Sequence, residues 1–496
     1  KTYISRLYIQ KTSAGKCCPI LKKFFLILTC LIASFTAFSQ QVWTLEKCIE
    51  HALTNNISIK QQMLQIEAGK SSLLQSKLDL FPSLNAGAQH GYNYGKTVDR
   101  YTNQFASNSV QSDNFYLGSQ ITLWDGFRKI NQLKQNKVEL EAARYDADKF
   151  MDDISLNIAT AYLQILYFKE ALRTAQNQVD ISQQQTNRLS IWVKEGKTAQ
   201  GELFTLQSQL ASAKVAVVDA RNNLDLAYLT LAQMLDLPST DGFEIEVPDL
   251  EIGSQPALLA NPDQVYLYAL ETQPDIKSAE LRVKSSEYNL MMARGSQSPS
   301  LTMSASLATG YSGAAQMLAD TLTKVVPIGY TMINGMPSEL VYSSYLYSTY
   351  KDKPFGDQFN DNINRSLNFN LSIPIFNGWA TRSAISKAKL NVENTKYNLD
   401  QSKLQLRKTI QQAYADARGA LDKYQASITG VDAARESYRY AEQKFEVGFI
   451  NSVDYNNARQ EYEKADSDML RAKYEYIFKT TVLDFYMGKP ISLKRK

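Results

Sequence analysis

Residues 127–195 contain neither proline nor glycine, so no residue in this stretch interrupts a helix. Apolar residues recur within it at alternating steps of four and three. They are Ala147, Met151, Ile154, Ile158, Ala161, Ile165, Phe168, Leu172, Ala175 and Val179. Such a heptad seam keeps one stripe of a helix against a partner helix. At 1.5 Å per residue the helix would be ~100 Å long, which predicts a long coiled assembly instead of an ordinary globular domain.

The long run occurs twice in the chain. When the sequence is shifted by 252 positions, Gly196 meets Gly448, and the run itself returns as residues 380–447. A second shift, of 217 positions, matches the segments that precede the two runs. Two constant shifts over long spans indicate a tandem duplication. We therefore predict two helix–strand–strand–helix repeats, at 40–261 and 262–496.

Residues 1–39 are typical of a secretory signal peptide. Two lysines precede the apolar run 24–38, and small residues at its end favour cleavage after Ser39. The run is short for a helix that spans a membrane. Cys30 raises the alternative of a lipoprotein signal, although the threonine before it and the apolar residues after it fit such a site poorly.

Charge and motif content exclude several classes of function. Six basic residues and no acid lie in the first 39 residues, so the net charge of +4 becomes −2 for the remainder, which gives no support for nucleic-acid binding. Cys48 is the one cysteine after that leader, so no intrachain disulfide framework can form. His51 and His90 lack metal-ligand spacing, and neither a glycine-rich phosphate loop nor a nucleophile elbow occurs. We expect no cofactor, no metal site and no enzyme activity.

The hydrophobic period changes from helical to two in four segments, within about 83–124 and 300–375. The apolar members are Leu84, Ala86, Ala88, His90 and Tyr92; Phe115, Leu117, Ile121 and Leu123; Leu301, Met303, Ala305 and Leu307; and Leu367, Phe369, Leu371 and Ile373. Each segment predicts a strand with one apolar face and one polar face.

Two kinds of structure explain such strands: a half-buried sheet on a soluble core, or a membrane barrel with lipid outside and water inside. The long helices leave little sequence to cover a sheet, and the signal peptide predicts export, so the barrel is favoured. Four strands cannot close a membrane barrel, whose smallest common form has ~8. The chain must then oligomerise. Sequence alone does not choose between two and three copies, although eight strands would leave almost no lumen.

Shorter helical runs flank each long one. The runs 200–236 and 262–297 would together span ~110 Å, close to the length of one long helix, and 44–80 with 450–487 would do the same. We expect each long helix to be flanked by two short helices stacked end to end. Residues 238–261, which are rich in proline and glycine, would form a belt of irregular structure at mid-height.

Two turns join the long helices to the runs that follow them. Gly196 and Gly448 occupy matched positions there, where C-capping is the usual role of glycine. An acid follows each turn, Glu202 in the first repeat and Asp454 in the second. The helix dipole favours a carboxylate in a first turn. With cyclic symmetry, the same acid would become a ring of charge that selects or holds cations at a narrow mouth.

The pattern resembles the TolC family of outer-membrane efflux proteins. The resemblance is carried by the signal peptide, the duplicated halves, Trp124–Gly126 and Phe376–Gly378, and it covers nearly all of 40–490. It implies a mainly α protein with transmembrane β structure: a homotrimer whose 12-stranded barrel, four strands per chain, continues into a long periplasmic α-helical barrel. It also implies the outer membrane of a Gram-negative bacterium, contact with its lipid, and two partners, a periplasmic adaptor (membrane-fusion) protein and an inner-membrane pump.

The family's functional positions fall near the turns. Asp454 matches the outer of two aspartates that narrow the family's closed periplasmic entrance, the second aspartate is Asn457 here, and an arginine that helps lock the entrance is Ile450. Both departures lessen the expected strength of the closed state. With Glu202, these positions give a predicted periplasmic aperture of Asp454, Asn457 and Glu202. The predicted adaptor-docking tips are Gly196, Lys197, Val447, Gly448 and Phe449.

The leading hypothesis is a passive exit duct of a tripartite efflux or secretion system. The alternative is a secreted coiled-coil structural or adhesion protein without a lumen, against which the four amphipathic strands argue. A long tyrosine-rich loop, 313–364, joins two of the predicted barrel strands and would lie outside the cell. Gating, recognition and no role at all stay open for it at this stage.

Overall fold

The computed structural model describes residues 42–248, 261–450 and 452–492, apart from residues 100, 102, 104, 107 and 108. The predicted signal peptide lies outside these residues, and so does half of the predicted belt, residues 249–260. The chain divides into two compact units. The helical unit comprises Lys1–Ile57, Asp152–Asn261 and Gln412–Lys496, and the sheet unit comprises Ser58–Met151 and Pro262–Gln411. Each unit therefore takes segments from both halves of the chain.

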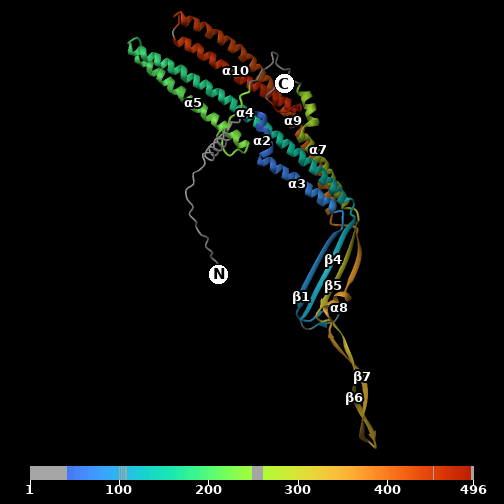
Figure 1. Ribbon diagram of the computed structural model, residues 1–496. Helices are drawn as coiled ribbons and strands as arrows, with labels where there is room; N and C mark the ends of the chain where they lie inside the picture. Colours follow the sequence, from blue (N-terminus) through green and yellow to red (C-terminus); the bar gives the residue numbers. More distant parts are fainter. Residues whose placement is uncertain are drawn as a thin grey trace, which may run out of the picture. The chain divides into compact units, whose positions relative to one another are not determined.

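The long helices and the helices that follow them repeat with the shift found in the sequence. Helix α4 spans Arg128–Lys194 and α9 spans Ala380–Glu446, while α5 spans Gln200–Met234 and α10 spans Ser452–Tyr486 (Figure 1). Every bound of the second pair of helices lies 252 positions after its counterpart. Helix α4 begins where the side chain of Asp125 accepts hydrogen bonds from the backbone N–H groups of Arg128 and Lys129, at 3.1 and 3.0 Å. The predicted long helices are confirmed.

The runs 44–80 and 262–297 were each predicted as one helix, and the structure shows a break in both. The first contains α2 (Leu45–Asn55) and α3 (Ile57–Leu78), and the second contains α6 (Pro262–Thr272) and α7 (Pro274–Gly295). These bounds repeat with the shift of 217 positions.

The two breaks have different causes. Pro274 lacks an N–H group and forces Gln273 out of the helical region, to ψ 131°. At the matched Asn56 no proline is present. Instead, Asp236 accepts a hydrogen bond from the Ile57 N–H at 2.9 Å, and the Asn56 side chain donates one to the Met234 carbonyl at 3.2 Å. A carboxylate from elsewhere in the chain therefore caps the start of α3.

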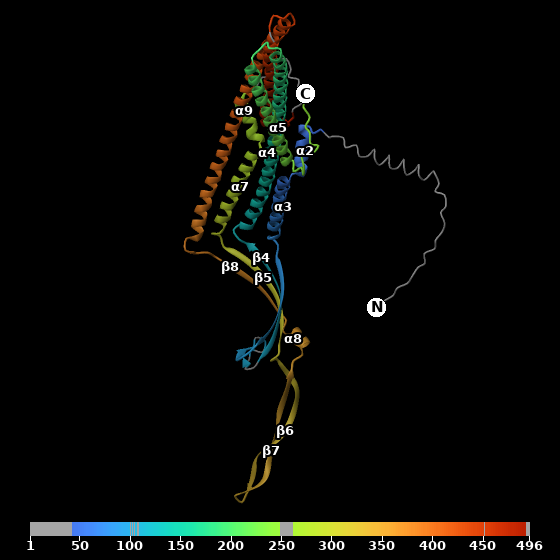
Figure 2. The ribbon, with the colours of Figure 1, turned by 90° about the vertical axis from the view of Figure 1, so that its left-hand side faces the viewer.

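The sheet unit contains the four predicted strands as one antiparallel sheet in the order β1-β4-β5-β8 (Figure 2). Their bounds are Ser83–Asn93 for β1, Val110–Trp124 for β4, Ser300–Ser312 for β5 and Asn364–Ser372 for β8. A short hairpin of β2 (Thr97–Val98) and β3 (Phe105–Ala106) lies between β1 and β4 in sequence. The alternation seen in the sequence therefore describes one sheet to which both halves contribute two strands.

The register places the apolar residues of all four strands on one face. Ala86 lies opposite Leu117, which lies opposite Leu307. This apolar face consists of Leu84, Ala86, Ala88, Phe115, Leu117, Ile121, Leu301, Met303, Ala305, Leu307, Leu367, Phe369 and Leu371. The polar face includes Asn85, Gln89, Gln120, Thr302, Ser304, Ser306, Asn368 and Asn370. Leu84 is 70% exposed and Phe369 is 60% exposed, so the single chain leaves its apolar face uncovered.

The tyrosine-rich segment predicted as a loop is largely ordered secondary structure. It contains β6 (Gln316–Ile333), β7 (Met336–Asp352) and α8 (Phe355–Asp361). Strands β6 and β7 form a separate two-stranded ribbon that turns at Asn334 and Gly335. Both turn residues have positive φ, 52° and 82°. An Asn-Gly pair between alternating strands is a strong hairpin signal, so this part of the fold was visible in the sequence.

The core of the helical unit gathers around Tyr162 of α4. Its hydroxyl donates to the carbonyl oxygens of Glu246 and Trp43, at 2.6 and 3.2 Å. Trp43 and Ile245 form a parallel β-bridge beside it. The described part of the predicted belt, residues 238–248, is thereby tied to the long helix.

A buried polar network joins α4 to α10. Arg173 donates to the carboxylate of Glu170, one turn earlier on α4, at 2.5 Å. The Ser467 hydroxyl of α10 donates to the same carboxylate at 2.6 Å, and Thr174 donates to Ser467 at 2.7 Å. The Glu170 side chain is 8% exposed, and the arginine also reaches Asp466 at 3.4 Å. Removal of the arginine would leave a buried carboxylate without its cation.

Among the helices that the structure describes, none has the length and apolar character needed to cross a membrane.

We predict that Arg173→Ala lowers the stability of the protein by about 1–2 kcal/mol, less than for a fully buried pair because the arginine is half exposed. Arg144→Ala is the matched control. Arg144 forms an ion pair of the same i, i+3 spacing on the same helix, with Glu141 at 2.9 Å, but both side chains of this pair are exposed. Its loss should cost less than about 0.5 kcal/mol. Thermal unfolding followed by circular dichroism measures both, and equal losses would contradict the network.

Candidate functional site

The first predicted tip is a helix end closed by Gly196, which has φ +72°. Its N–H donates to the Val193 carbonyl at 3.0 Å, and the Lys197 N–H donates to the Trp192 carbonyl at 2.9 Å. These two bonds form a Schellman motif, which satisfies the last carbonyl groups of α4. Glycine is favoured at position 196 because a residue with a side chain is strained at positive φ.

The second tip repeats the motif at the end of α9. Gly448 has φ +74°, its N–H donates to the Phe445 carbonyl at 3.0 Å, and the Phe449 N–H donates to the Lys444 carbonyl at 2.8 Å. The structure therefore places the predicted tip residues Gly196 and Lys197 in one cap, and Val447, Gly448 and Phe449 in the other.

The two tips differ in chemistry although their backbones match. In the first, Lys197 Nζ lies 2.6 Å from the Glu195 carboxylate, so the tip presents a closed ion pair. In the second, the matched positions are Val447 and Phe449, which are 79% and 78% exposed. An aromatic and an aliphatic side chain held in water at a rigid cap favour a partner that covers them.

The predicted aperture residues lie in the first two turns of the helices that follow the tips. Glu202 is exposed on α5, and its carboxylate accepts a hydrogen bond from the Thr198 hydroxyl at 2.7 Å. Asp454 and Asn457 are exposed on α10, and their spacing of three places them on one face of the helix. Glu461 continues that exposed face one turn further on. The structure thus groups Asp454 with Asn457, while Glu202 belongs to the other turn.

An aromatic cluster, not foreseen from the sequence, holds the end of α9 to the start of α10. We call Tyr438, Phe445, Tyr455 and Tyr462 the aromatic clamp. The hydroxyls of Tyr438 and Tyr455 are 3.0 Å apart, Tyr438 stacks on Tyr462 at 5.8 Å between centroids, and Phe445 stacks on Tyr455 at 4.8 Å. Burial, with the hydrogen bond to Tyr455, raises the pKa of Tyr438 above its usual range.

The clamp explains which way the aperture residues face. Tyr455 and Tyr462 turn one side of α10 toward α9, so Asp454 and Asn457, on a neighbouring side, stay outside the helix pair. A signal was present in the sequence, because 438 and 445, and likewise 455 and 462, are seven residues apart.

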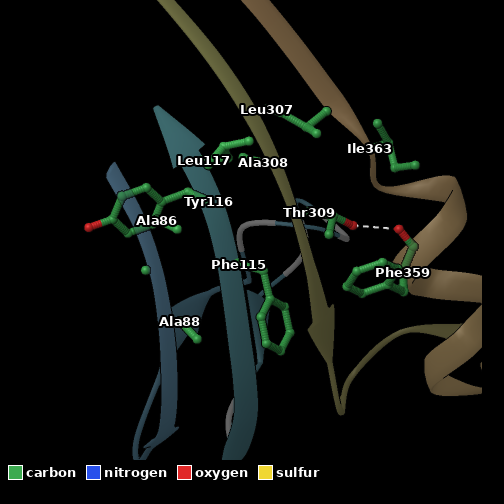
Figure 3. A pocket seen from close by; sticks show the side chains of 11 residues that line it. Ala86, Ala88, Phe115, Tyr116, Leu117, Leu307, Ala308, Thr309, Phe359 and Ile363 are labelled. Carbon is green, nitrogen blue, oxygen red and sulfur yellow. Dashed lines mark hydrogen bonds between the residues drawn. The ribbon is translucent and has the colours of Figure 1, made fainter. Parts of the chain in front are cut away.

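An open apolar pocket of about 540 Å³ lies where α8 meets the apolar face of the sheet. Phe115 of β4 points toward Phe359 of α8, and the Thr309 hydroxyl donates to the Phe359 carbonyl at 2.6 Å (Figure 3). Phe355 lies 5.5 Å from the ring of Tyr311. Phe115, Phe355 and Phe359 therefore extend the apolar face of the sheet onto α8.

No cluster of three or more His, Cys, Asp or Glu side chains suited to a metal ion occurs within the described ranges.

The profile of one protein family, described as outer membrane efflux protein, matches residues 48–236 and 265–489. Together these ranges cover most of the chain and both of its halves. The chain belongs to the outer membrane efflux protein family.

Known proteins and structures agree with this family. The chain is 22% identical to the outer membrane protein TolC of Escherichia coli over 460 residues, which are 92% of this chain and 84% of TolC. It is 21% identical to protein CyaE of Bordetella pertussis, over 87% of this chain and 79% of CyaE. The crystal structure of the outer membrane protein VceC from Vibrio cholerae matches with a TM-score of 0.69 and 14% identity, over 90% of this chain and 97% of VceC.

Family membership decides the broad function. The protein is an outer-membrane channel of an efflux or secretion system in a Gram-negative bacterium, with a part that extends into the periplasm, and it is not an enzyme. The resemblance to the TolC family and the fold class of long helices with membrane strands are confirmed. The alternative of a secreted coiled-coil adhesion protein is set aside.

We predict that Gly448→Ala destabilises the second tip by about 1 kcal/mol, because alanine is strained at φ +74°. The matched control is Gly430→Ala, in the interior of α9, where an added Cβ meets open space, and it should stabilise the protein by up to about 1 kcal/mol. Hydrogen exchange of the amides around 444–449 measures the first effect directly. Unchanged exchange in Gly448→Ala would show that the cap does not hold the tip.

Proposed function

We propose that three copies of this chain form a passive duct, in which twelve strands close a barrel across the outer membrane and the long helices continue it into the periplasm. The observation that carries this proposal is the four-stranded sheet, with its apolar face exposed and its polar face opposite. In the sheet that the described residues form, β1 and β8 each pair on one side only. A membrane requires both edges to be sealed, and the apolar face suits lipid.

Three copies fit better than two. Twelve strands enclose a water-filled lumen lined by the polar face, whereas eight strands enclose an interior that side chains fill. The duplication also supports cyclic assembly, because each chain already contributes two similar halves. We retain the division into a leader at 1–39 and repeats at 40–261 and 262–496 as part of this proposal.

The duct would be passive, because the sequence carries no nucleotide-binding loop. Energy and cargo selection would come from an inner-membrane pump, joined to the duct by a periplasmic adaptor protein. The tips Gly196, Lys197, Val447, Gly448 and Phe449 would meet the adaptor. The exposed Val447 and Phe449 support this role, since they form a rigid apolar surface in water.

The periplasmic aperture would be lined by Asp454, Asn457 and Glu202. Threefold symmetry turns one Asp454 into a ring of three carboxylates, and the exposed face of α10 favours this arrangement. Such a ring attracts cations and holds divalent ions more tightly than monovalent ions.

We predict that Asp454→Asn raises the conductance of the purified protein in planar bilayers and weakens block by divalent cations several-fold, because three charges leave the narrowest ring. Asp468→Asn is the matched control. Asp468 is an exposed acid two heptads further along α10, ~21 Å from Asp454. Its replacement should change neither the conductance nor the block by divalent cations. If Asp454→Asn behaved as Asp468→Asn does, Asp454 would not line the aperture.

We predict that Val447→Ser with Phe449→Ser abolishes export in cells while bilayer conductance stays unchanged. The change removes the apolar tip surface but leaves the cap, whose hydrogen bonds are made by backbone groups. Sensitivity of cells to a panel of toxic compounds reports export. Normal export by this variant would place the adaptor contact elsewhere, and lost conductance would show that the tips serve the pore itself.

A further inference from the structure

The ribbon of β6 and β7 is the largest feature that the duct does not explain. In sequence it lies between β5 and β8, and it extends from the end of the sheet where β5 ends and β8 begins (Figures 1 and 2). At about 3.3 Å per residue its strands are ~55 Å long. An isolated two-stranded ribbon is marginally stable in water, so one this long needs a surface to cover it.

The base of the ribbon is fixed to the sheet. The Gln358 side chain, 1% exposed, accepts a hydrogen bond from the Ser312 N–H at 2.9 Å and donates to the carbonyl oxygens of Ser312 and Lys353, at 3.0 and 2.8 Å. Ser312 ends β5, and Lys353 follows β7. One buried amide therefore ties both ends of the ribbon together where it joins the sheet.

The ribbon has two unlike faces. Between Leu340 and Asp352 every residue of β7 has a partner in β6, so its alternate residues define each face. From Leu340 to Tyr350 the uncharged face comprises Leu340, Tyr342, Ser344, Leu346, Ser348 and Tyr350, with their partners Tyr330, Pro327, Val325, Thr323, Thr321 and Leu318, and Asp352 follows only at its base. The opposite, charged face carries Asp320, Lys324 and Lys351 among the apolar and aromatic residues Leu322, Val326, Val341, Tyr345 and Tyr347, and Lys324 Nζ lies 5.8 Å from the ring centre of Tyr347.

The uncharged face is exposed along the whole ribbon. Leu346, near its centre, is 71% exposed, and the six other large apolar or aromatic members are all more than two-fifths exposed. Aromatic side chains present roughly 150–250 Å² each. Three tyrosines and four aliphatic side chains together bring this face to the ~300–600 Å² of the largest apolar patch on a typical monomer.

The edges of the ribbon are protected against pairing with a further strand, whereas its uncharged face is not covered. Strand β6 shows register shifts at three places, and Pro327 and Pro337 interrupt the two strands. Bulges and prolines oppose the addition of further strands at an edge. A covering partner would therefore pack on the face and would not extend the ribbon edge to edge.

We propose that the uncharged faces of the three ribbons of a trimer pack against one another outside the cell, forming a β assembly around the axis of the duct. This inference rests on the proposed trimer. From Leu340 to Tyr350 this face carries no cation that could pair with a phosphate headgroup, and it meets its own copy without charge repulsion. The ribbon also leaves the sheet beside β8, the edge strand that the trimer seals against a neighbouring copy, so a second copy lies beside its base.

Cysteine cross-linking tests the proposed packing. Leu346→Cys places a thiol on the uncharged face, and Tyr345→Cys places one on the charged face, one residue away in the same strand. Both are made in the full chain with Cys48→Ala, and the parent without an added cysteine sets the background. After oxidation or a short bis-maleimide, Leu346→Cys should give a dimer band on a denaturing gel at least fivefold stronger than Tyr345→Cys gives.

A second variant pair tests the same face without cysteine. Leu346→Glu would bring three like charges together and should speed hydrogen exchange across 316–352 about tenfold. Tyr345→Glu lies opposite Lys324 and should leave exchange near the parent rate.

The outcomes separate this inference from the proposed duct. A conducting trimer that shows no difference between the two faces would overturn the packing of the ribbons and leave the duct intact. Protection of the ribbon that appears only after lipopolysaccharide vesicles are added would assign the face to lipid, and would overturn it as well. A monomer in detergent would overturn both proposals.

Discussion

The unpaired edges of β1 and β8 impose the condition on which the rest of the structure depends. A strand edge presents N–H and C=O groups that lipid cannot satisfy, and each such group left open costs several kcal/mol. The same sheet has an apolar face that water does not favour. Neither solvent suits a single copy, so the sheet is stable only when other copies seal its edges and lipid covers one face. Trimer formation is in this sense a consequence of hydrogen bonding.

The duplication extends this reasoning to the helices. The bounds of α2, α3, α4 and α5 recur in α6, α7, α9 and α10 at two constant shifts, so the proposed trimer presents six near-equivalent repeats. Positions at which the two repeats differ then indicate where the two halves of the chain have different functions. The largest differences are at the tips, where an ion pair at Glu195 and Lys197 is matched by exposed Val447 and Phe449, and in the ribbon of β6 and β7, whose counterpart among the described residues of the first half is the short hairpin of β2 and β3.

Much of the fold follows from periodicity, because long elements repeat their signal many times. The heptads of 127–195 predicted α4 to within one residue at each end, and alternation predicted all four strands of the sheet. Glycine at 196 and 448 predicted the caps. The breaks between α2 and α3 and between α6 and α7 are harder to predict from periodicity. Pro274 is a local signal for the break before α7, whereas the break at Asn56 depends on Asp236, which lies far away in the sequence.

The site was predicted less completely than the fold. Family resemblance located Asp454 and Asn457, but it said nothing of the aromatic clamp that decides which way they face. The length of segment 313–364 predicts a loop, whereas Asn334–Gly335 between alternating residues predicts the hairpin that the structure shows. Side-chain packing between elements, such as Tyr438 with Tyr455, leaves only a weak trace in any one segment.

Disulfide formation between the two edge strands tests the account most directly. Asn85→Cys on β1 would be combined in turn with cysteine at Ser366, Asn368 and Asn370 on β8, with Cys48→Ala throughout. Within one copy these strands are separated by two others, ~14 Å in all, which is beyond the ~7 Å limit for a disulfide. The account predicts that at least one combination yields a covalent trimer on a denaturing gel. Monomers alone from all three combinations, in protein that retains its native helical content, would contradict it.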